Sequence, residues 1–274
     1  MKILVPTDFS KPASVAIRYA AEFAQHTGAE LVLFHALSIE GPPHAMAAMK
    51  THQILEAMED GAKNDLIVKM HELRKMEGPS VNVSYKLVTG HPVQDMIGHY
   101  LQHHPVDLIV MGTKGASGMK KVLMGSNSAA VIGKIDVPVI TVPEHARFKP
   151  VQHLVYASDL NDIGGEMETL IRFCRGFDAS IHILHIHSTA APVGLDREAL
   201  KNELRTKYDY TKLTLDFRES ENVEEAIEDF IADTHADMLA MFTHQPTFLE
   251  RLFGKSVTRE LAFHSMIPLL SFKK

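Results

Sequence analysis

The sequence predicts an α/β protein built from two tandem domains, each a parallel β-sheet with helices on both faces. One observation is that short runs rich in Val, Ile and Leu alternate with segments of helical pattern. Such near-continuous apolar runs are typical of strands buried on both faces of a parallel sheet, and the intervening helices supply the crossovers. The other observation is that this pattern occurs twice along the 274 residues.

The internal repeat rests on four pairs of segments that keep the same order in both halves. Matching positions within them are Asp8 and Asp159, His35 and His185, Asp107 and Asp237, and Pro138 and Pro268. The first two pairs are 151 and 150 residues apart, and the last two are both 130 residues apart. The second half therefore lacks about 20 residues, which we assign to the 39–79 region. The predicted domains are 1–144 and 150–274, joined by a charged connector flanked by prolines.

The elements of the first half follow the order βαβαβαβαβ, which makes five strands. Ser10 is a suitable N-cap for the first helix, Pro12 lies early in it, and Gly28 can end it. A long helix, which Gly61 could interrupt, follows the second strand. The expected helices span 11–27, 44–77, 92–103 and 125–134, and the clearest strand segments are 3–5, 30–36, 107–111 and 137–142.

The composition argues against several classes of protein and several kinds of site. Net charge is −6, from 34 acidic and 28 basic residues, which disfavours duplex nucleic acid as the main partner. The single cysteine, Cys174, allows neither an intramolecular disulfide nor a four-thiolate zinc site, and a core position is expected for it. No apolar run approaches the length of about 18 residues that a transmembrane helix requires. We therefore expect a cytoplasmic protein without a membrane partner.

Two loops are expected to carry the chemistry, because ligands of such sheets bind beyond the carboxyl ends of the strands. Asp8 follows the first strand. The loop from Gly112 to Ser128 has the pattern Gly, two residues, Gly, nine residues, Gly-Ser. Glycines let the backbone approach a ligand closely, and the helix expected at Gly125 offers free N–H groups to an anion such as phosphate. Asp8 could accept a hydrogen bond from a ribose hydroxyl or hold a divalent metal.

The pairing of Pro6-x-Asp8 with this glycine pattern resembles the nucleotide-binding branch of the universal stress protein family, and the repeat extends the resemblance over essentially the whole chain. The resemblance implies sheets of strand order 3-2-1-4-5, a bound ATP, with Mg²⁺ at Asp8 as a further expectation, and pairing of the two domains through their last strands. Whether two chains also form a homodimer stays open. The residues implied to border adenine and ribose or to hold the phosphates are Pro6, Thr7, Asp8, Ala36, Met111, Gly112, Gly115, Gly125, Ser126, Asn127 and Ser128.

The second half has lost this glycine pattern. At the offset of 130, Phe242 replaces Gly112 and Lys255 replaces Gly125. Gln245 likewise replaces Gly115, and Phe248 replaces Gly118, a further glycine of the same loop. Side chains at such positions crowd a ligand and strain the backbone. We therefore expect the second domain not to bind ATP. It would complete a dimer-like scaffold, or hold a more apolar ligand beside Phe242 and Phe248.

The histidines and methionines of the chain are expected to have structural roles. His35 and His185 stand at equivalent strand ends, which favours partly buried, hydrogen-bonded histidines over metal ligands. Five methionines surround the expected long helix. We expect them to pack in the core or between the domains, with a flexible hydrophobic groove as the alternative. They are Met46, Met49, Met58, Met70 and Met76.

Three functional classes follow from the sequence. The first is an ATP-binding stress-response or regulatory protein, with the nucleotide in the first domain. The second is an interaction scaffold that needs no nucleotide, and the third is an enzyme, at most a slow ATPase. The glycine loop favours the first class. Phosphoryl transfer needs a positioned base or acceptor, and Asp8 is the only evident candidate for the base.

Overall fold

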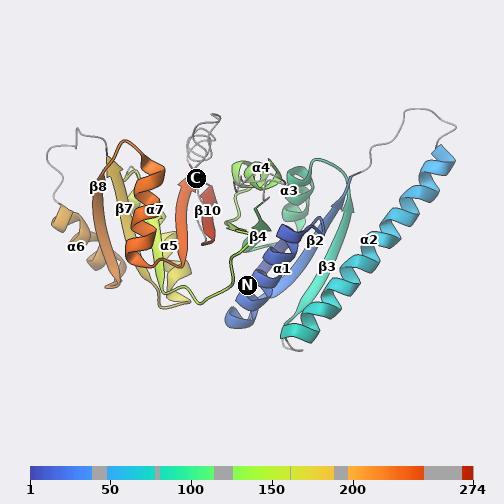
Figure 1. Ribbon diagram of the computed structural model, residues 1–274, viewed down its shortest axis with the longest axis horizontal. Coiled ribbons are helices and arrows are strands. Elements are labelled where there is room, and N and C mark those ends of the chain that lie inside the picture. The colour runs from blue at the N-terminus through green and yellow to red at the C-terminus, as the bar shows by residue number, and fades with distance from the viewer. Residues whose placement is uncertain are drawn as a thin grey trace. The chain divides into compact units, whose positions relative to one another are not determined.

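The computed structural model describes residues 1–38, 48–77, 81–113, 126–160, 162–187, 197–243 and 267–273. These residues divide into two compact units, one ending at Phe148 and the other beginning at Lys149 (Figure 1). Each unit is an α/β fold of the predicted kind.

The sheet of the first unit has the strand order β3-β2-β1-β4-β5, with all neighbouring strands parallel. Its strands are β1 (Lys2–Pro6), β2 (Glu30–Leu37), β3 (Val83–Thr89), β4 (Leu108–Gly112) and β5 (Val139–Val142). This is the order 3-2-1-4-5 that the family resemblance implied. The strand order reverses between β1 and β4, so a crevice is expected at their carboxyl ends.

Local sequence explains where the first helix begins and ends. In α1 (Lys11–Thr27), the Ser10 hydroxyl oxygen accepts a hydrogen bond from the backbone N–H of Ala13 at 3.4 Å. At the other end Gly28 takes a left-handed conformation, with φ of +68°, which glycine adopts without steric cost. Both ends of α1 are therefore as predicted.

The predicted long helix is α2 (Ala48–Glu77), and it runs without interruption through Gly61, where the sequence had allowed a break. A glycine in a helix interior costs about 1 kcal/mol relative to alanine. Burial of Leu66 and Leu73 outweighs that cost, since each leucine is at most 3% exposed. The remaining helices of this unit are α3 (Val93–His103) and α4 (Ser126–Lys134), which pack against each other.

The segment that follows β5 packs onto α1. The ring of Phe148 meets the rings of Tyr19 and Phe23 edge to face, with centroids 5.4 and 5.8 Å apart. Lys11 forms an ion pair with Glu144 at 2.5 Å, and the hydrogen bond from Lys11, and then its positive charge, hold the pKa of that carboxyl below its usual value. The first compact unit thus continues through this segment.

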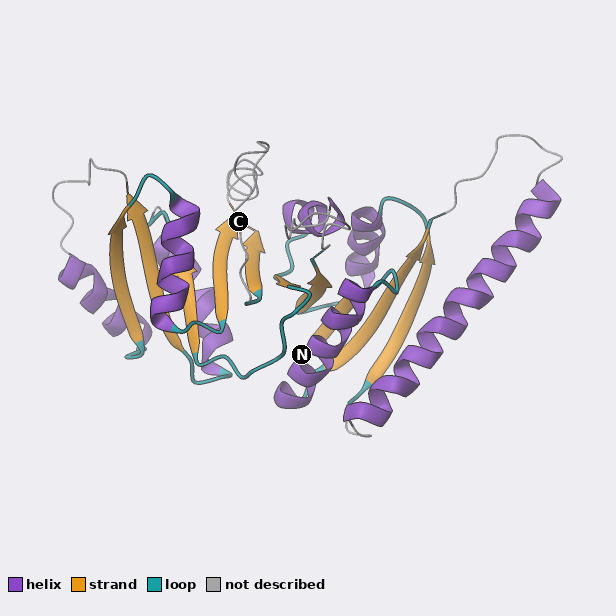
Figure 2. Ribbon diagram, viewed as in Figure 1, coloured by secondary structure: helices purple, strands orange, loops and turns teal. Residues whose placement is uncertain are grey.

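The second unit repeats the strand order as β8-β7-β6-β9-β10, again parallel throughout. Its strands are β6 (His153–Ala157), β7 (Ser180–His187), β8 (Leu213–Glu219), β9 (Met238–Thr243) and β10 (Leu269–Lys273). Its described helices are α5 (Ile163–Arg175), α6 (Arg197–Tyr208) and α7 (Val223–Thr234), which flank the strands in Figure 2.

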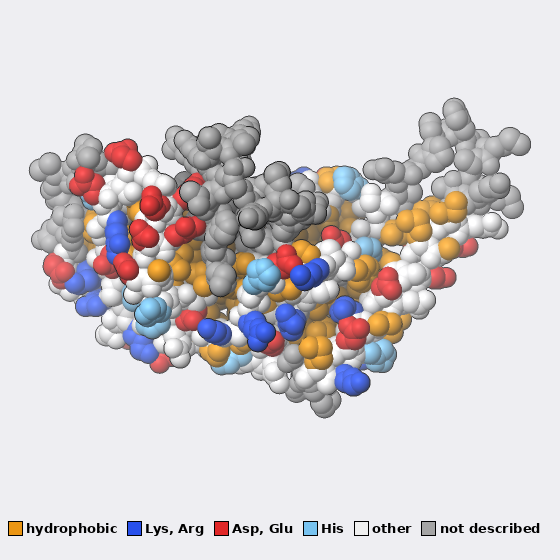
Figure 3. All heavy atoms as spheres, viewed as in Figure 1, with side chains coloured by type: hydrophobic (Ala, Val, Ile, Leu, Met, Phe, Trp, Pro, Cys, Tyr) orange, Lys and Arg blue, Asp and Glu red, His pale blue; other side chains and the backbone are white. Residues whose placement is uncertain are grey.

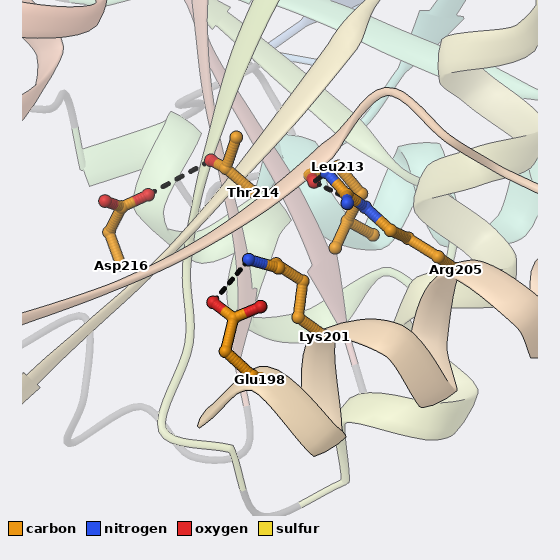
Figure 4. Close-up of polar contacts among 6 residues, drawn as sticks. All are labelled: Glu198, Lys201, Arg205, Leu213, Thr214 and Asp216. Carbon is orange, nitrogen blue, oxygen red and sulfur yellow. Dashed lines mark hydrogen bonds and ion pairs between the residues drawn. The ribbon is translucent and has the colours of Figure 1, made fainter. Parts of the chain in front are cut away.

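An arginine makes the same hydrogen bond within each unit. Arg205 of α6 donates from Nε to the carbonyl oxygen of Leu213 at 3.0 Å (Figure 4), and Arg74 of α2 donates to that of Val83 at 3.1 Å. Each arginine therefore ties the second helix of its unit to the start of the third strand. The hydroxyl of Thr214 donates to Asp216 at 3.0 Å, and Lys201 pairs with Glu198. Figure 4 draws both contacts as dashed lines.

Some apolar side chains lie outside the two cores. Met58 and Met76 of α2 are 43% and 62% exposed, so the prediction that they pack in the core is wrong for these two methionines. Met46 and the side chain of Met49 lie outside the described part of the chain. Hydrophobic side chains stand among the charged ones along α2 in Figure 3. Cys174 is fully buried, as predicted, and no described helix is long and apolar enough to span a membrane.

Candidate functional site

A pocket of about 410 Å³ opens at the carboxyl ends of β1, β2 and β4, beside the first residues of α1 and α4. This volume lies within the usual range of about 300–1,000 Å³ for small-molecule sites. Its position is the one expected for a doubly wound sheet, because the strand order reverses there.

Eight of the eleven predicted site residues line this pocket. They are Pro6, Thr7, Asp8, Ala36, Met111, Gly112, Asn127 and Ser128. Ser126 begins α4, but its side chain is not described. Gly115 and Gly125 lie wholly outside the described residues. The structure therefore brings together the described predicted residues from four separate segments of the chain.

The loop that carries Asp8 is held by short-range hydrogen bonds. Asp8 Oδ1 accepts from the N–H of Ser10 at 3.0 Å, and the hydroxyl oxygen of Thr7 accepts from the N–H of Phe9 at 3.0 Å. Phe9 has a φ of +61°, which is uncommon for a residue with a side chain. Asp8 thus organises the start of α1, while its exposed carboxylate also faces the pocket.

Gly112 and Ser128 join β4 to the flanking helices. A Cβ atom on Gly112 would lie 2.4 Å from the carbonyl oxygen of Pro12, so α1 approaches β4 too closely for any side chain. The buried hydroxyl of Ser128 donates to the carbonyl oxygen of Gly112 at 3.0 Å, which fixes the first turn of α4 against the end of β4. Both residues therefore shape the pocket wall.

Sequence reasoning missed a group of lining residues. Gly90, His91 and Val93 come from the connection between β3 and α3, which also reaches the carboxyl edge of the sheet. Gly90 has a φ of +151°, and a Cβ there would lie 2.3 Å from Sδ of Met96. The position of this loop after a strand was the available clue. The other missed lining residues are Ser10, Pro12, Ala13 and Ser38.

The chemical character of the pocket suits a ligand that is apolar at one end and anionic at the other. Pro6, Ala36 and Met111 offer apolar surface, while Asn127 and Ser128 lie in the first turn of α4. The N–H groups of a helix's first turn favour negative charge. The residues present therefore fit a nucleotide. Among the described residues, no group of three or more His, Cys, Asp or Glu side chains could hold a metal ion.

The second unit has aromatic rings at the equivalent position. The Phe242 ring stacks on that of Phe272 with centroids 4.6 Å apart, and it meets the Tyr156 ring edge to face at 5.6 Å. The buried Tyr156 hydroxyl donates to Glu166 and accepts from Ser158. Burial, and then this contact with Glu166, raise the pKa of Tyr156. Gln245, Phe248 and Lys255 lie outside the described residues.

Comparison with known proteins assigns the family. The family model of the universal stress protein family matches residues 1–143, which contain every predicted residue of the site. The chain belongs to the universal stress protein family. Residues beyond 143, including all of the second unit, lie outside this match.

Curated relatives support the assignment for about half of the chain. The universal stress protein MJ0577 of Methanocaldococcus jannaschii is 28% identical over 152 residues, which cover 52% of this chain and 93% of that protein. The universal stress protein YxiE of Bacillus subtilis is 27% identical over 145 residues, which cover 52% of this chain and 97% of that protein.

A solved structure shows the same fold along the whole chain. It is a universal stress protein from Archaeoglobus fulgidus, with a TM-score of 0.75 and 18% identity, covering 99% of this chain and 98% of that one. The two-domain α/β fold therefore recurs in this stress protein. At this level of identity, the likeness extends to the fold alone.

Proposed function

We propose that this universal stress protein binds ATP in the pocket of its first unit and acts as a nucleotide-dependent stress-response protein. The observation that carries the proposal is the pocket itself, which gathers residues from the ends of β1, β2 and β4 and from the start of α4. Adenine and ribose would lie near Pro6, Thr7, Asp8, Ala36 and Met111. The phosphates would meet the first turn of α4 and the loop that runs from Gly112 to Gly125.

We propose that the first unit binds ATP and does not hydrolyse it rapidly. Among the described residues that line the pocket, Asp8 is the one carboxylate. Its Oδ1 already accepts a hydrogen bond from Ser10. Phosphoryl transfer also needs stabilisation of the developing charge, usually by a metal ion or a cationic side chain. Mg²⁺ beside Asp8 would supply that charge, and we expect any hydrolysis of ATP to be slow.

Titration calorimetry of the full chain with ATP, with and without Mg²⁺, tests the proposal. We expect one ATP per chain. Asp8→Ala should weaken binding at least tenfold, whereas Asp159→Ala, the equivalent change in the second unit, should leave it unchanged. Native protein that ignores ATP, or equal losses in the two variants, would overturn the proposal. Release of ADP well above the uncatalysed rate would favour the enzyme class instead.

We propose that the second unit does not bind ATP in this manner. Phe242 replaces Gly112, and its ring packs on Phe272 and Tyr156. A stoichiometry of two ATP per chain would contradict this. A scaffold role for this unit, an apolar ligand beside Phe242, and pairing of the two halves through their last strands stay predictions.

A further inference from the structure

Thr7 joins the pocket to the centre of the sheet. It is buried, it lines the pocket, and it immediately precedes Asp8. Its N–H donates to the carbonyl oxygen of Phe34 in β2 at 2.8 Å. This hydrogen bond continues the pairing of β1 with β2 by one residue, so the main chain leaves the sheet at the peptide that joins Thr7 to Asp8.

His35 holds that peptide from the other side. Its Nδ1 lies 2.7 Å from the carbonyl oxygen of Thr7. A carbonyl oxygen can only accept, so Nδ1 carries the hydrogen. The half-buried imidazole also packs against the Phe9 ring, with centroids 4.7 Å apart. Phe34 and His35, neighbours in β2, therefore engage both polar backbone groups of Thr7.

The orientation of this peptide decides where Asp8 points. If the Thr7 carbonyl rotated away from His35, the backbone leading into Asp8 would rotate with it. The Asp8 carboxylate would then no longer face the pocket. His35 is not among the residues that line the pocket, so it acts on a ligand through the residues that it contacts on either side of Asp8, Thr7 and Phe9. This is the arrangement of a residue that positions a binding group without touching the ligand.

The second unit contains the same arrangement. The Nδ1 of His185 donates to the carbonyl oxygen of Ser158 at 2.9 Å, and the N–H of Ser158 donates to Leu184 at 2.9 Å. Leu160 has a φ of +63°, close to that of Phe9. Both histidines are thus partly buried and hydrogen-bonded, as the sequence led us to expect. A substitution at His185 therefore reproduces the structural loss away from the proposed site.

We infer that His35 is a positioning residue for ligand binding: its Nδ1–H sets the Thr7–Asp8 peptide in the orientation that presents Asp8 to the pocket. The inference rests on the proposed function, because it concerns the same pocket. It adds a determinant of affinity on β2, outside the loops that the glycine pattern identifies.

The test compares four variants of the full chain. His35→Leu and His35→Ala remove the donor. His35→Asn keeps an N–H on the same branch point as Nδ1, and His185→Leu removes the equivalent donor in the second unit. Each variant is measured for ATP affinity by calorimetry, for stability by urea unfolding, and for amide hydrogen exchange at Phe9 and Ser10.

We expect His35→Leu and His35→Ala to weaken ATP binding about tenfold and to speed exchange at Phe9 and Ser10. His35→Asn should stay within about threefold of the native affinity. His185→Leu should match the stability loss of His35→Leu while leaving ATP affinity unchanged. Native affinity in the folded donor-free variants, or an equal loss in His185→Leu, would overturn the inference. Failure of the native chain to bind ATP would instead overturn the proposed function.

Discussion

The carbonyl oxygen of Pro12 occupies the space that a side chain on Gly112 would need, with only 2.4 Å between that oxygen and the position of a Cβ. The carbonyl carbon of Pro12 would lie 2.6 Å from the same point. Both obstacles are backbone atoms of the first turn of α1, so neither can swing aside as a flexible side chain would. Gly112 is therefore a packing requirement of the fold as well as part of the pocket wall.

Gly112→Ala is expected to destabilise the protein by about 1–3 kcal/mol, the usual cost of forcing an extra carbon into a packed interior. Urea unfolding followed by circular dichroism measures the change. Gly61→Ala is the matched control, because its added Cβ meets no atom within 4 Å. This control should stabilise α2 by about 1 kcal/mol. Equal stability of the native protein and Gly112→Ala would contradict the packing argument.

Most of the fold could be predicted from the sequence, because it depends on local patterns and on the repeat. Apolar runs placed the strands, and Ser10 and Gly28 marked the ends of α1 through ordinary capping chemistry. A long helix over 44–77 was also predicted, but its continuity at Gly61 could not be decided in the same way. Its persistence through Gly61 depends on tertiary burial of Leu66 and Leu73, which no local pattern displays.

The candidate site was predictable where residues follow strands that the topology brings together, as for Asp8, Ala36 and Met111. The residues of the site were not predictable where their position depends on how the backbone turns or on how helices pack. His91 enters the pocket because the backbone turns at Gly90, and the contact of Ser128 with the Gly112 carbonyl depends on how α4 packs. Such details arise from three-dimensional packing between segments that are distant in the chain.

The stability of the second unit should fall at alkaline pH because of Tyr210. Its buried hydroxyl donates to the carbonyl oxygen of Ala179, and burial raises its pKa from 10.0 to about 12. The native state therefore favours the neutral phenol. This contribution is fully present below pH 10 and is lost as the pH rises from 10 towards 12.

Urea unfolding at several pH values, with phenolate absorbance as a second signal, measures this loss. Tyr210→Phe removes the titrating group, and it should cost about 1 kcal/mol at neutral pH through the lost hydrogen bond. It should also flatten the decline of stability above pH 10. An undiminished alkaline decline in this variant would show that other groups cause it.

Cys174 should be unreactive in the folded protein. It is completely buried, and burial raises the pKa of its thiol to about 12. The thiolate is the reactive form, so its population is very small at mildly alkaline pH. Because Cys174 is the single cysteine of the chain, labelling with a thiol reagent reports on this one site. We expect slow labelling of native protein and rapid labelling in urea. Rapid stoichiometric labelling of the native chain would contradict the burial.

Tyr156 and Glu166 form a buried polar pair where the first unit has two valines. At the offset of 151, their counterparts are Val5 and Val15, both of which are buried. Glu166 is only 1% exposed and accepts a hydrogen bond from the Tyr156 hydroxyl. Tyr156→Phe removes that donor from a buried carboxyl group, and we expect a loss of about 2–3 kcal/mol in unfolding free energy.

The double variant Tyr156→Phe/Glu166→Leu separates this loss from a general packing defect. It removes the buried carboxyl together with its donor, so no polar group of the pair is left in the core. Replacing both partners of a buried polar contact with apolar groups is often nearly neutral. We therefore expect the double variant to be more stable than Tyr156→Phe alone, as measured by urea unfolding. A double variant at least as unstable as the single one would mean that the pair matters through shape rather than through its hydrogen bond.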